Sequence, residues 1–310
     1  MEIIRGLNNL RRAHFGCALA IGNFDGVHLG HQALLAQLVD HARQLALPAT
    51  VMTFQPHPQE YFVPECHVAH LLHFREKLEQ LKAQGVDRVL CVRFNAALAS
   101  MSAGEFIDQL LVSRLGVKYL TVGEDFRFGA GRSGDIEILR EQGTISGFET
   151  VPAPTIEYDG QRVSSTRVRE ALEQGDLALA EVLLDRPYSI SGRVVHGDKR
   201  GREIGFPTAN INLKRHKVPV SGVFAIEMHG LESGVVKGVA NIGSRPTVDG
   251  QRTLLEVHLF DFDQTIYGRQ VCVVLKNKIR DEKRFSGLEE LTQQIGCDVA
   301  AARAYLATGC

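Results

Sequence analysis

The chain has 310 residues, which exceeds the usual size of one hydrophobic core, so two domains are expected. Its hydrophobic content of 44% and charged content of 23% are typical of a folded protein and exclude a largely disordered chain. The formal net charge of −1 at pH 7 provides no bulk electrostatic attraction to nucleic acid or to anionic membranes.

The cysteine pattern and the lack of targeting features predict a cytoplasmic protein. The six cysteines are scattered without a Cys-x-x-Cys pair, so they fit neither a zinc site nor a redox dithiol. No run of about 18 apolar residues is present to span a bilayer, and the N-terminus lacks the basic-then-apolar character of a signal peptide. We therefore expect reduced thiols and no membrane partner.

Up to about residue 184, apolar strand-like runs alternate with helix-like segments, which is typical of a parallel sheet covered by helices. A helix is predicted from Phe74 to Gln84, closed by Gly85, and the capping-box pattern from Ser102 to Glu105 opens another. Ligands of such sheets bind beyond the carboxyl ends of the strands. The five predicted strands are Ala18–Ile21, Thr50–Phe54, Val89–Phe94, Tyr119–Val122 and Phe148–Val151.

The segment from Gly22 to His31 follows the first strand and reads Gly-Asn-Phe-Asp-Gly-Val-His-Leu-Gly-His. It predicts a strand-to-helix turn, where unpaired backbone N–H groups and glycines favour an anion. His28 and His31 are three residues apart, so on a first helical turn they project from one face and can donate to phosphate oxygens. A zinc pair is the alternative, but zinc needs further ligands, and no Cys or third His lies nearby in sequence.

Two further segments follow predicted strands. His57 stands in a Pro-His-Pro sequence after the second strand, and the prolines hold it at a fixed place that suits phosphate recognition; an exposed loop histidine is the alternative. After the fourth strand, Asp125 can accept a hydrogen bond, and the aromatic rings of Phe126 and Phe128 can pack on a planar ligand ring or simply belong to the core.

The stretch from Val163 to Arg169 precedes a helix-like segment that runs to Glu173. It combines hydroxyl groups, helix-start N–H groups and two guanidinium groups, which predicts a second anion cradle. A plain capping box is the alternative, but it does not require both arginines.

After Asp185-Arg186-Pro187 the helical periodicity ends and short β-rich runs begin, so we expect one domain over residues 1–184 and a second over 185–310. The runs are spaced like antiparallel strands of a small barrel or sandwich. They are Ser189–Val195, Gly222–Met228, Val235–Ile242, Leu254–Phe260 and Val271–Leu275. A terminal helix is predicted between Gly287 and Gly309, with an apolar face of Leu288, Leu291, Ile295, Val299 and Leu306.

The segment from Gly192 to Asn210 is rich in glycine and basic residues, and its amides can wrap phosphates, but it lacks the Gly-Lys-Ser/Thr ending of a P-loop. Thr208 and Asn210 are two apart on a predicted extended segment, so both can face one side and offer hard oxygen ligands to Mg²⁺. A solvated hairpin connection followed by a turn is the alternative.

Glu256 lies between Leu255 and Val257 in a predicted strand. Alternation directs its carboxylate to the face opposite those apolar side chains, where it can act as a base. An outward, salt-bridging glutamate is the alternative.

Together these motifs resemble the bacterial bifunctional riboflavin kinase/FAD synthetases, over nearly the whole chain and in the family's order. Segments 22–31 and 163–169 resemble the phosphate-binding motifs of the nucleotidylyltransferase half, and segments 192–210, 241–247 and 255–262 resemble riboflavin kinase motifs. The resemblance implies an α/β protein. A Rossmann-like nucleotidylyltransferase domain with a five-stranded parallel sheet would precede an antiparallel riboflavin-kinase β-barrel with a terminal helix.

The resemblance implies phosphorylation of riboflavin to FMN by ATP, with release of ADP, and adenylylation of FMN to FAD, with release of pyrophosphate. Mg²⁺ would act with ATP, and FMN and FAD would be substrate and product rather than permanent prosthetic groups. For adenylyl transfer, the implied phosphate-stabilising residues are His28, His31 and Arg167. The implied binding residues are Gly22, Phe24, Asp25, His57, Asp125, Phe128, Ser164, Ser165 and Thr166.

For the kinase, the resemblance implies that Glu256 accepts the proton of the riboflavin 5′-hydroxyl and that Thr208 and Asn210 bind the metal. The implied substrate-binding residues are Gly197, Lys199, Gly201, Gly205, Pro207, Arg280 and Phe285.

The expected partners are riboflavin, FMN and ATP, without nucleic acid or membrane, and the protein is expected to be a monomer or weak homo-oligomer. One rival hypothesis keeps the N-terminal nucleotidylyltransferase but gives it a different phosphate acceptor. Another is a flavin-binding regulator without catalysis. Turnover of ATP separates the enzymes from the regulator.

Overall fold

The apolar run Cys17–Ile21 forms β2, a central strand of a parallel sheet, and all five of its residues are buried. A strand covered on both faces by helices needs a continuous apolar run rather than an alternating one. The sheet has six parallel strands in the order β1-β4-β3-β2-β5-β6. The other strands are β1 (Glu2–Arg5), β3 (Ala49–Gln55), β4 (Arg88–Arg93), β5 (Val117–Val122) and β6 (Glu149–Pro152).

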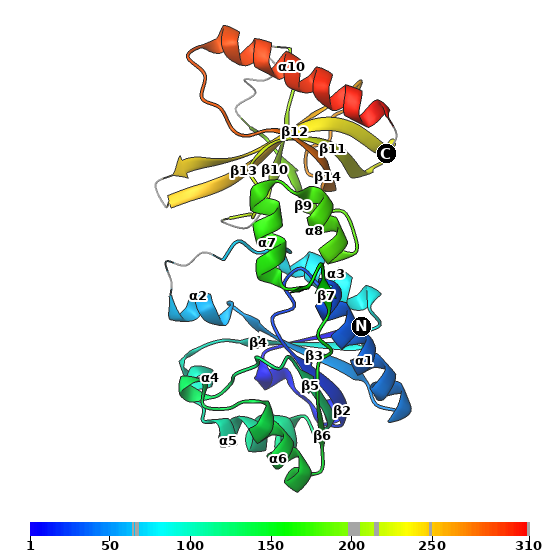
Figure 1. The fold of residues 1–310 in the computed structure, drawn as a ribbon, viewed down its shortest axis with the longest axis vertical. Helices are drawn as coiled ribbons and strands as arrows, with labels where there is room; N and C mark the ends of the chain where they lie inside the picture. The colour runs from blue at the N-terminus through cyan, green and yellow to red at the C-terminus, as the bar shows by residue number, and fades with distance from the viewer. Residues whose placement is uncertain (64, 66–67, 198–204, 214–216, 248–249, 309–310) are drawn as a thin grey trace. The chain divides into compact units, whose positions relative to one another are not determined.

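The computed structural model describes residues 1–63, 65, 68–197, 205–213, 217–247 and 250–308, without the side chains of 244–252. Over these residues the chain divides into two compact units, and each can be followed in Figure 1. The first contains residues 1–68 and 74–164, and the second contains residues 69–73 and 165–310.

The α/β fold class is confirmed, and all five expected strands of the N-terminal sheet are present. The sequence missed β1, a four-residue edge strand that pairs with β4. The chain leaves β2 toward β3 on one side and later returns to pair β5 on the other, so a topological switch point lies at the carboxyl end of β2. Ligands of open α/β sheets bind at such points.

Two helices of the first unit were predicted from the sequence, and both are present. The α3 helix ends one residue before its predicted end, and the Ser102 hydroxyl accepts a hydrogen bond from the Glu105 N–H at 3.2 Å, as the capping box requires. The helices are α1 (Leu29–Gln44), α2 (Pro58–Phe62), α3 (Phe74–Ala83), α4 (Ala96–Ala99), α5 (Ala103–Glu105), its π-helical continuation Phe106–Arg114, and α6 (Ile136–Ser146). The small hairpin β7 (Glu157–Tyr158) and β8 (Gln161–Arg162) was not predicted.

The second unit is a closed antiparallel barrel in the order β10-β13-β12-β11-β14-β9, which settles the choice between barrel and sandwich. Closure removes the exposed strand edges that a small sheet would otherwise present. The strands are β9 (Ser189–Val195), β10 (Ala209–Asn212), β11 (Gly222–Leu231), β12 (Gly234–Thr247), β13 (Gly250–Leu259) and β14 (Gln270–Arg280). Helices α7 (Ser165–Gln174) and α8 (Leu177–Leu184) belong to this unit.

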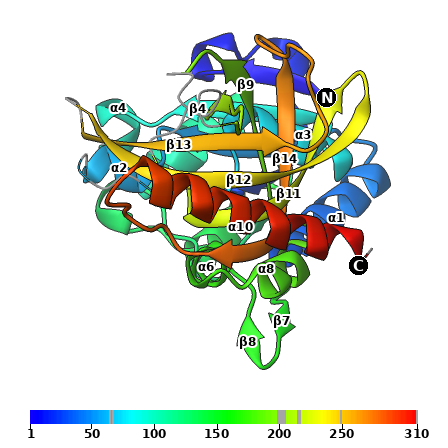
Figure 2. The ribbon, with the colours of Figure 1, turned by 90° about the horizontal axis from the view of Figure 1, so that it is seen from above.

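The predicted terminal helix is α10 (Leu288–Ala307), which crosses β11 and β12 (Figure 2). Its buried apolar residues Ala302 and Leu306 pack against Val223 and Phe260. The predicted apolar face was wrong at its first position, because Leu288 is 64% exposed. Periodicity alone could not show that the barrel contact begins further along the helix.

Candidate functional site

The segment between β2 and α1 forms the predicted strand-to-helix turn. His28 is the N-cap of α1, and its Nδ1 accepts a hydrogen bond from the His31 backbone N–H at 3.4 Å. Phe24 and Val27 have φ angles of 49° and 41°, a left-handed conformation that costs a non-glycine residue about 1–3 kcal/mol. Such strain persists only where the surroundings impose it, and it is concentrated at functional sites.

The two imidazole rings stack with centroids 3.8 Å apart and an angle of 21° between their planes. Burial, followed by the charges of His28, Lys77 and Arg162, lowers the pKa of His31 well below its usual value. His31 is therefore neutral at pH 7. A neutral His31 can donate a hydrogen bond but carries no positive charge, and its expected contact with phosphate stays a prediction.

The buried Nδ1 of His31 has no hydrogen-bond partner among the described residues. A buried N–H without an acceptor is rarer than a buried lone pair without a donor, so we assign the proton of neutral His31 to Nε2. In His28 the Nδ1 accepts a hydrogen bond from the His31 N–H, so a proton on this ring lies on Nε2. Both histidines thus keep an Nε2–H donor.

Gly22 and Asp25 complete this turn. A Cβ atom at Gly22 would lie 3.2 Å from the Phe24 ring, which leaves little room for any side chain there. Asp25 is buried, and its charge acts on the neighbouring ammonium group of Lys77. The expected residues of segment 22–31 are therefore together at the switch point.

His57 is half-buried and caps α2. The Nδ1 of His57 accepts a hydrogen bond from the Gln59 backbone N–H at 3.2 Å, and the backbone N–H of His57 donates to Glu60 Oε2 at 3.2 Å. The preceding Gln55–Pro56 peptide bond is cis. The imidazole is thus fixed beyond the carboxyl end of β3, at the edge of the sheet where the sequence placed it.

The loop after β5 separates its two expected residues. Asp125 is exposed and accepts from Arg162 Nη2 at 3.1 Å. Phe128 is only 7% exposed and packs against Phe106 and Phe126 in the core of the first unit. Of the two readings offered by the sequence for Phe128, the structure shows the core packing, and flavin contact stays a prediction.

The predicted second cradle spans the limit between the two units. Ser164 is the last residue of the first unit, and the carbonyl oxygen of Val163 would lie 3.4 Å from a Cβ atom at Gly30, at the start of α1. Ser165, Thr166 and Arg167 form the first turn of α7. Their approach to the phosphate site therefore stays a prediction.

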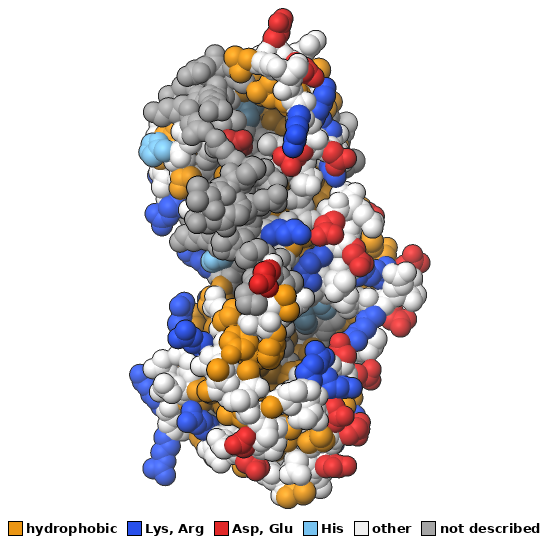
Figure 3. Space-filling model, turned by 90° about the vertical axis from the view of Figure 1, so that its left-hand side faces the viewer, with side chains coloured by type: hydrophobic (Ala, Val, Ile, Leu, Met, Phe, Trp, Pro, Cys, Tyr) orange, Lys and Arg blue, Asp and Glu red, His pale blue; other side chains and the backbone are white. Residues whose placement is uncertain are grey.

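An aromatic cluster that the sequence did not single out lies beside the expected residues. The ring centres of Phe54 in β3 and Phe94 just after β4 are 6.0 Å apart. The ring centre of Phe94 also lies 5.3 Å from that of Tyr61 and 5.6 Å from that of Phe62, both in α2. Phe62 is 64% exposed. Hydrophobic side chains gather on the face of this unit that Figure 3 presents, which is the side that carries α2 in Figure 1.

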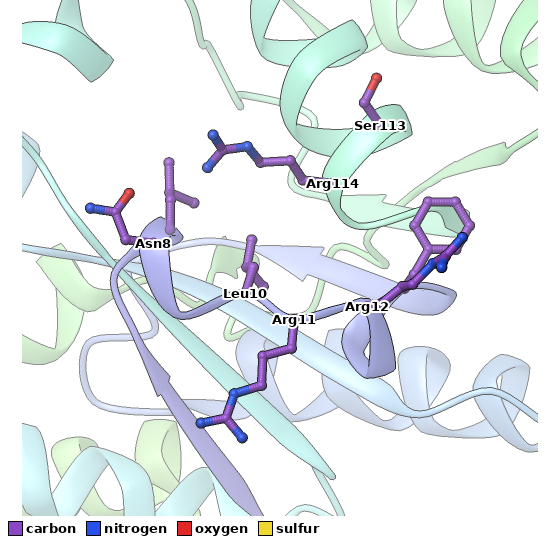
Figure 4. A pocket seen from close by; sticks show the side chains of 8 residues that line it. Asn8, Leu10, Arg11, Arg12, Ser113 and Arg114 are labelled. Atoms are coloured by element: carbon purple, nitrogen blue, oxygen red, sulfur yellow. The ribbon is translucent and has the colours of Figure 1, made fainter.

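A cavity of about 830 Å³ lies elsewhere in the first unit, beside the starts of β2 and β5. Figure 4 shows Arg114 extending toward Asn8 and Leu10, while Arg11 points the other way. Its lining residues are Leu7, Asn8, Leu10, Arg11, Arg12, Phe15, Ser113 and Arg114. No residue of the predicted motifs lines this cavity. Although its volume is large, we therefore place the candidate site at the carboxyl ends of the strands.

In the barrel, Glu256 on β13 lies directly opposite Asn210 on β10 and Asn241 on β12. Directly opposite residues of an antiparallel pair share a face and have Cβ atoms about 5 Å apart. The buried neighbours Leu255 and Val257 point to the other face, which confirms the predicted alternation. The register thus places the candidate base and one candidate metal ligand side by side.

Thr208 and Pro207 line a second cavity, of about 100 Å³, together with the segment from Phe262 to Tyr267. The Pro207 carbonyl is 2.9 Å from the Nδ1 of His258, which ties this segment to β13. Neither Asn210 nor Glu256 contributes to the lining of this cavity. That Thr208 and Asn210 face the same side therefore stays a prediction.

The glycine-rich loop is described only in part. A Cβ atom at Gly197 would overlap the side-chain amide of Asn210, so this glycine makes room for the candidate metal ligand. Gly205 has a φ of 84°, which favours glycine. Lys199 and Gly201, both expected to bind substrate, lie outside the described residues.

Arg280, expected near the flavin, forms an ion pair inside the second unit. Its Nε and Nη2 donate to the Asp298 carboxylate at 2.8 and 2.7 Å, and its Nη1 donates to the Asp281 carbonyl at 2.9 Å. The guanidinium carbon also lies 5.7 Å from the centre of the Phe285 ring. These contacts join β14 to α10, and substrate binding by Arg280 and Phe285 stays a prediction.

Two kinds of feature are absent from the described part of the chain. No group of three His, Cys, Asp or Glu side chains is arranged to hold a metal ion there. Nor is any helix within those residues both long and apolar enough to cross a membrane.

Comparison with known proteins gives a family for each half. The model of FAD synthetase matches residues 10–167, and the model of riboflavin kinase matches residues 184–306. Bifunctional riboflavin kinase/FMN adenylyltransferases are similar over the whole length. The protein from Escherichia coli (strain K12) is 53% identical over 306 residues, which are 98% of each chain. The one from Pseudomonas fluorescens is 50% identical over 308 residues, covering 99% of this chain and 98% of its own.

A solved structure shares the fold. A protein from Streptococcus pneumoniae, described as a macrolide-efflux protein, superposes with a TM-score of 0.82 at 32% identity. The match covers 98% of this chain and 99% of that one. Its description applies to that protein alone.

Proposed function

The chain belongs to the bifunctional riboflavin kinase/FMN adenylyltransferase family, and from this premise we propose how its residues divide the two reactions between the two units. It phosphorylates riboflavin to FMN and adenylylates FMN to FAD. The residues of segment 22–31 serve adenylyl transfer, and Asn210 with Glu256 serves the kinase.

In adenylyl transfer an FMN phosphate oxygen attacks the α-phosphorus of ATP in line, and pyrophosphate leaves. No protein nucleophile is needed, because positioning and charge stabilisation carry such reactions. The Nε2–H groups of His28 and His31 donate to the phosphate oxygens, and Arg167 neutralises charge on the leaving group. Removal of one such donor costs about 10²–10³ in kcat.

We assign the flavin ring of FMN to the aromatic cluster of Phe54, Tyr61, Phe62 and Phe94. The largely exposed Phe62 offers a ring face at the carboxyl edge of the sheet, on the same short helix that His57 caps. Phe62→Ala is expected to raise KM for FMN by about tenfold, the effect of losing one aromatic contact of about 1.4 kcal/mol. An unchanged KM for FMN would place the ring elsewhere.

In the kinase reaction Glu256 accepts the proton of the riboflavin 5′-hydroxyl while that oxygen attacks the γ-phosphorus, and ADP leaves. Strand alternation separates this carboxylate from the apolar core, and the register sets it beside the Asn210 amide. A positioned general base contributes about 10²–10⁴ to the rate. Glu256→Gln keeps the shape but removes the base.

Asn210 and Thr208 fit Mg²⁺ in chemistry, because an amide oxygen and a hydroxyl are hard ligands, and the nearby carboxylate of Glu256 favours a cation. The ion supplies neutralisation of the β- and γ-phosphate charge when it is bound with ATP. Gly197 leaves the space in which the Asn210 amide lies.

One observation supports assigning the two reactions to different units. The strand register pairs Glu256 with Asn210 in the second unit, whereas the stacked rings of His28 and His31 lie in the first. Purified protein incubated with riboflavin, ATP and Mg²⁺ should yield FAD on chromatography. Glu256→Gln should leave riboflavin unchanged yet convert supplied FMN, whereas His28→Ala should stop at FMN. Loss of both reactions in either variant would contradict two independent sites.

We propose a domain boundary near residues 184–185, where the match to riboflavin kinase begins. The contacts of α7 and α8 group residues 165–184 with the barrel, so these helices connect the two domains in sequence. A cytoplasmic location, a monomer or weak homo-oligomer, and the absence of nucleic acid partners stay predictions.

A further inference from the structure

Lys77 is a buried charged residue that the sequence did not single out. It lies on α3 beside the apolar residues Leu78 and Leu81, and only 9% of it is exposed. Burial lowers the pKa of its ammonium group, although the nearby Asp25 and Glu60 charges act in the opposite direction. Burying a charge costs several kcal/mol, so packing alone does not account for a lysine here.

The ammonium group contacts the phosphate-binding turn directly. Lys77 Nζ donates to the carbonyl oxygen of Asn23 at 2.7 Å, and Thr53 Oγ1 donates to the same oxygen at 3.4 Å. Side chains from α3 and β3 therefore hold one carbonyl of segment 22–31. That carbonyl immediately precedes Phe24, the first left-handed residue of the turn.

Holding this carbonyl also fixes the next N–H group. In a trans peptide the C=O and N–H bonds point in opposite directions, so the Phe24 N–H is directed away from Lys77. It donates no hydrogen bond within the described residues. Backbone N–H groups of this kind bind phosphate at strand-to-helix turns.

We propose that Lys77 is a positioning residue for adenylyl transfer: it fixes the Asn23–Phe24 peptide so that the Phe24 N–H and the two histidines face the reacting phosphates. The inference rests on the proposed role of segment 22–31. Lys77 acts through the backbone and does not touch the substrate. Without the ammonium group, Thr53 alone holds the carbonyl, and the strained turn relaxes.

The test compares Lys77→Met, which keeps the length of the side chain, with Lys77→Arg, which keeps the charge. Lys82→Met is the matched control, because Lys82 is exposed on the same helix. Each full-length variant is assayed for FMN adenylylation and for riboflavin phosphorylation, which serves as an internal reference. Thermal unfolding of each variant is recorded in parallel.

Lys77→Met is expected to lower kcat for FAD formation by about 10–100-fold with KM for ATP and FMN nearly unchanged, because only the transition state needs the exact geometry. Its kinase rate should stay at the wild-type level, and Lys77→Arg should recover part of the loss. The unfolding midpoint of Lys77→Met should fall, because buried Asp25 loses the neighbouring ammonium charge, so the rates are measured well below that midpoint. A merely structural lysine would not lower kcat in a variant that is fully folded at the assay temperature.

A wild-type kcat in Lys77→Met would overturn the inference, as would a loss of FAD formation that disappears when the assay temperature is lowered to where the variant is fully folded. His28→Ala is assayed beside it to separate this failure from that of the proposed site. If His28→Ala is inactive and Lys77→Met is active, only the role of Lys77 fails. If both are active in FAD formation, the assignment of segment 22–31 fails as well.

Discussion

The ion pair between Arg280 and Asp298 should stabilise the second unit far more than an exposed pair of the same geometry. Asp298 is 4% exposed and accepts from Arg280 at 2.8 and 2.7 Å and from Gln294 Nε2 at 3.0 Å. The same helix carries Arg303, which donates to Asp261 through two bonds of 2.8 Å at the surface. The two pairs differ mainly in burial.

Asp298→Asn keeps the size of the side chain but leaves the guanidinium charge of Arg280 without a counter-charge. Breaking a buried pair costs about 3–5 kcal/mol, and because Arg280 retains some contact with water we expect about 2–4 kcal/mol. For a domain of this size that lowers the unfolding midpoint by roughly 10 °C. Asp261→Asn should change it far less, because solvent screens an exposed pair.

Differential scanning calorimetry of both variants measures the difference, with circular dichroism as a check that the barrel is folded before heating. The double variant Arg280→Met/Asp298→Leu should lose less stability than Asp298→Asn, because it removes both charges together. Equal shifts for Asp298→Asn and Asp261→Asn would refute the reasoning that burial decides the strength of the pair.

Three further predictions concern single residues. Gly197→Ala should lower the kinase rate by at least about tenfold by displacing the Asn210 amide while FAD formation from FMN continues, and equal rates would show that Asn210 has room to move. Burial and the neighbouring charges lower the pKa of His31 in the folded protein. As the pH falls below about 6.5, this residue therefore binds a proton in the unfolded chain before it does so in the folded one. The unfolding free energy should then fall with acidification by up to about 1.4 kcal/mol per pH unit, and His31→Leu should lose this slope. Burial raises the pKa of Cys17 to about 11, so mass spectrometry after brief iodoacetamide treatment at pH 7.5 should find exposed Cys297 modified and Cys17 unmodified, and equal labelling would contradict the burial.

The local elements and most of the chemistry could be predicted from the sequence. The buried run of β2, the turn to α1 and the capping box at Ser102 each depend on residues within about ten positions, where period and backbone preference dominate. The alternation around Glu256 is equally local, and it was predicted correctly. The motifs of both halves, in the family's order, also indicate both activities.

Contacts between distant segments depend on register and packing, which no local pattern encodes. Lys77 meets Asn23 from 54 positions away, and Glu256 meets Asn210 only because β13 pairs with β10 in one register. The same packing buries Phe128 and leaves Leu288 in solvent, although both are apolar and lie in plausible core patterns. Local residue patterns were therefore enough to predict the elements and the kinds of chemistry. Which side chains meet depends on how strands pair and helices pack across the chain, and only the folded molecule shows it.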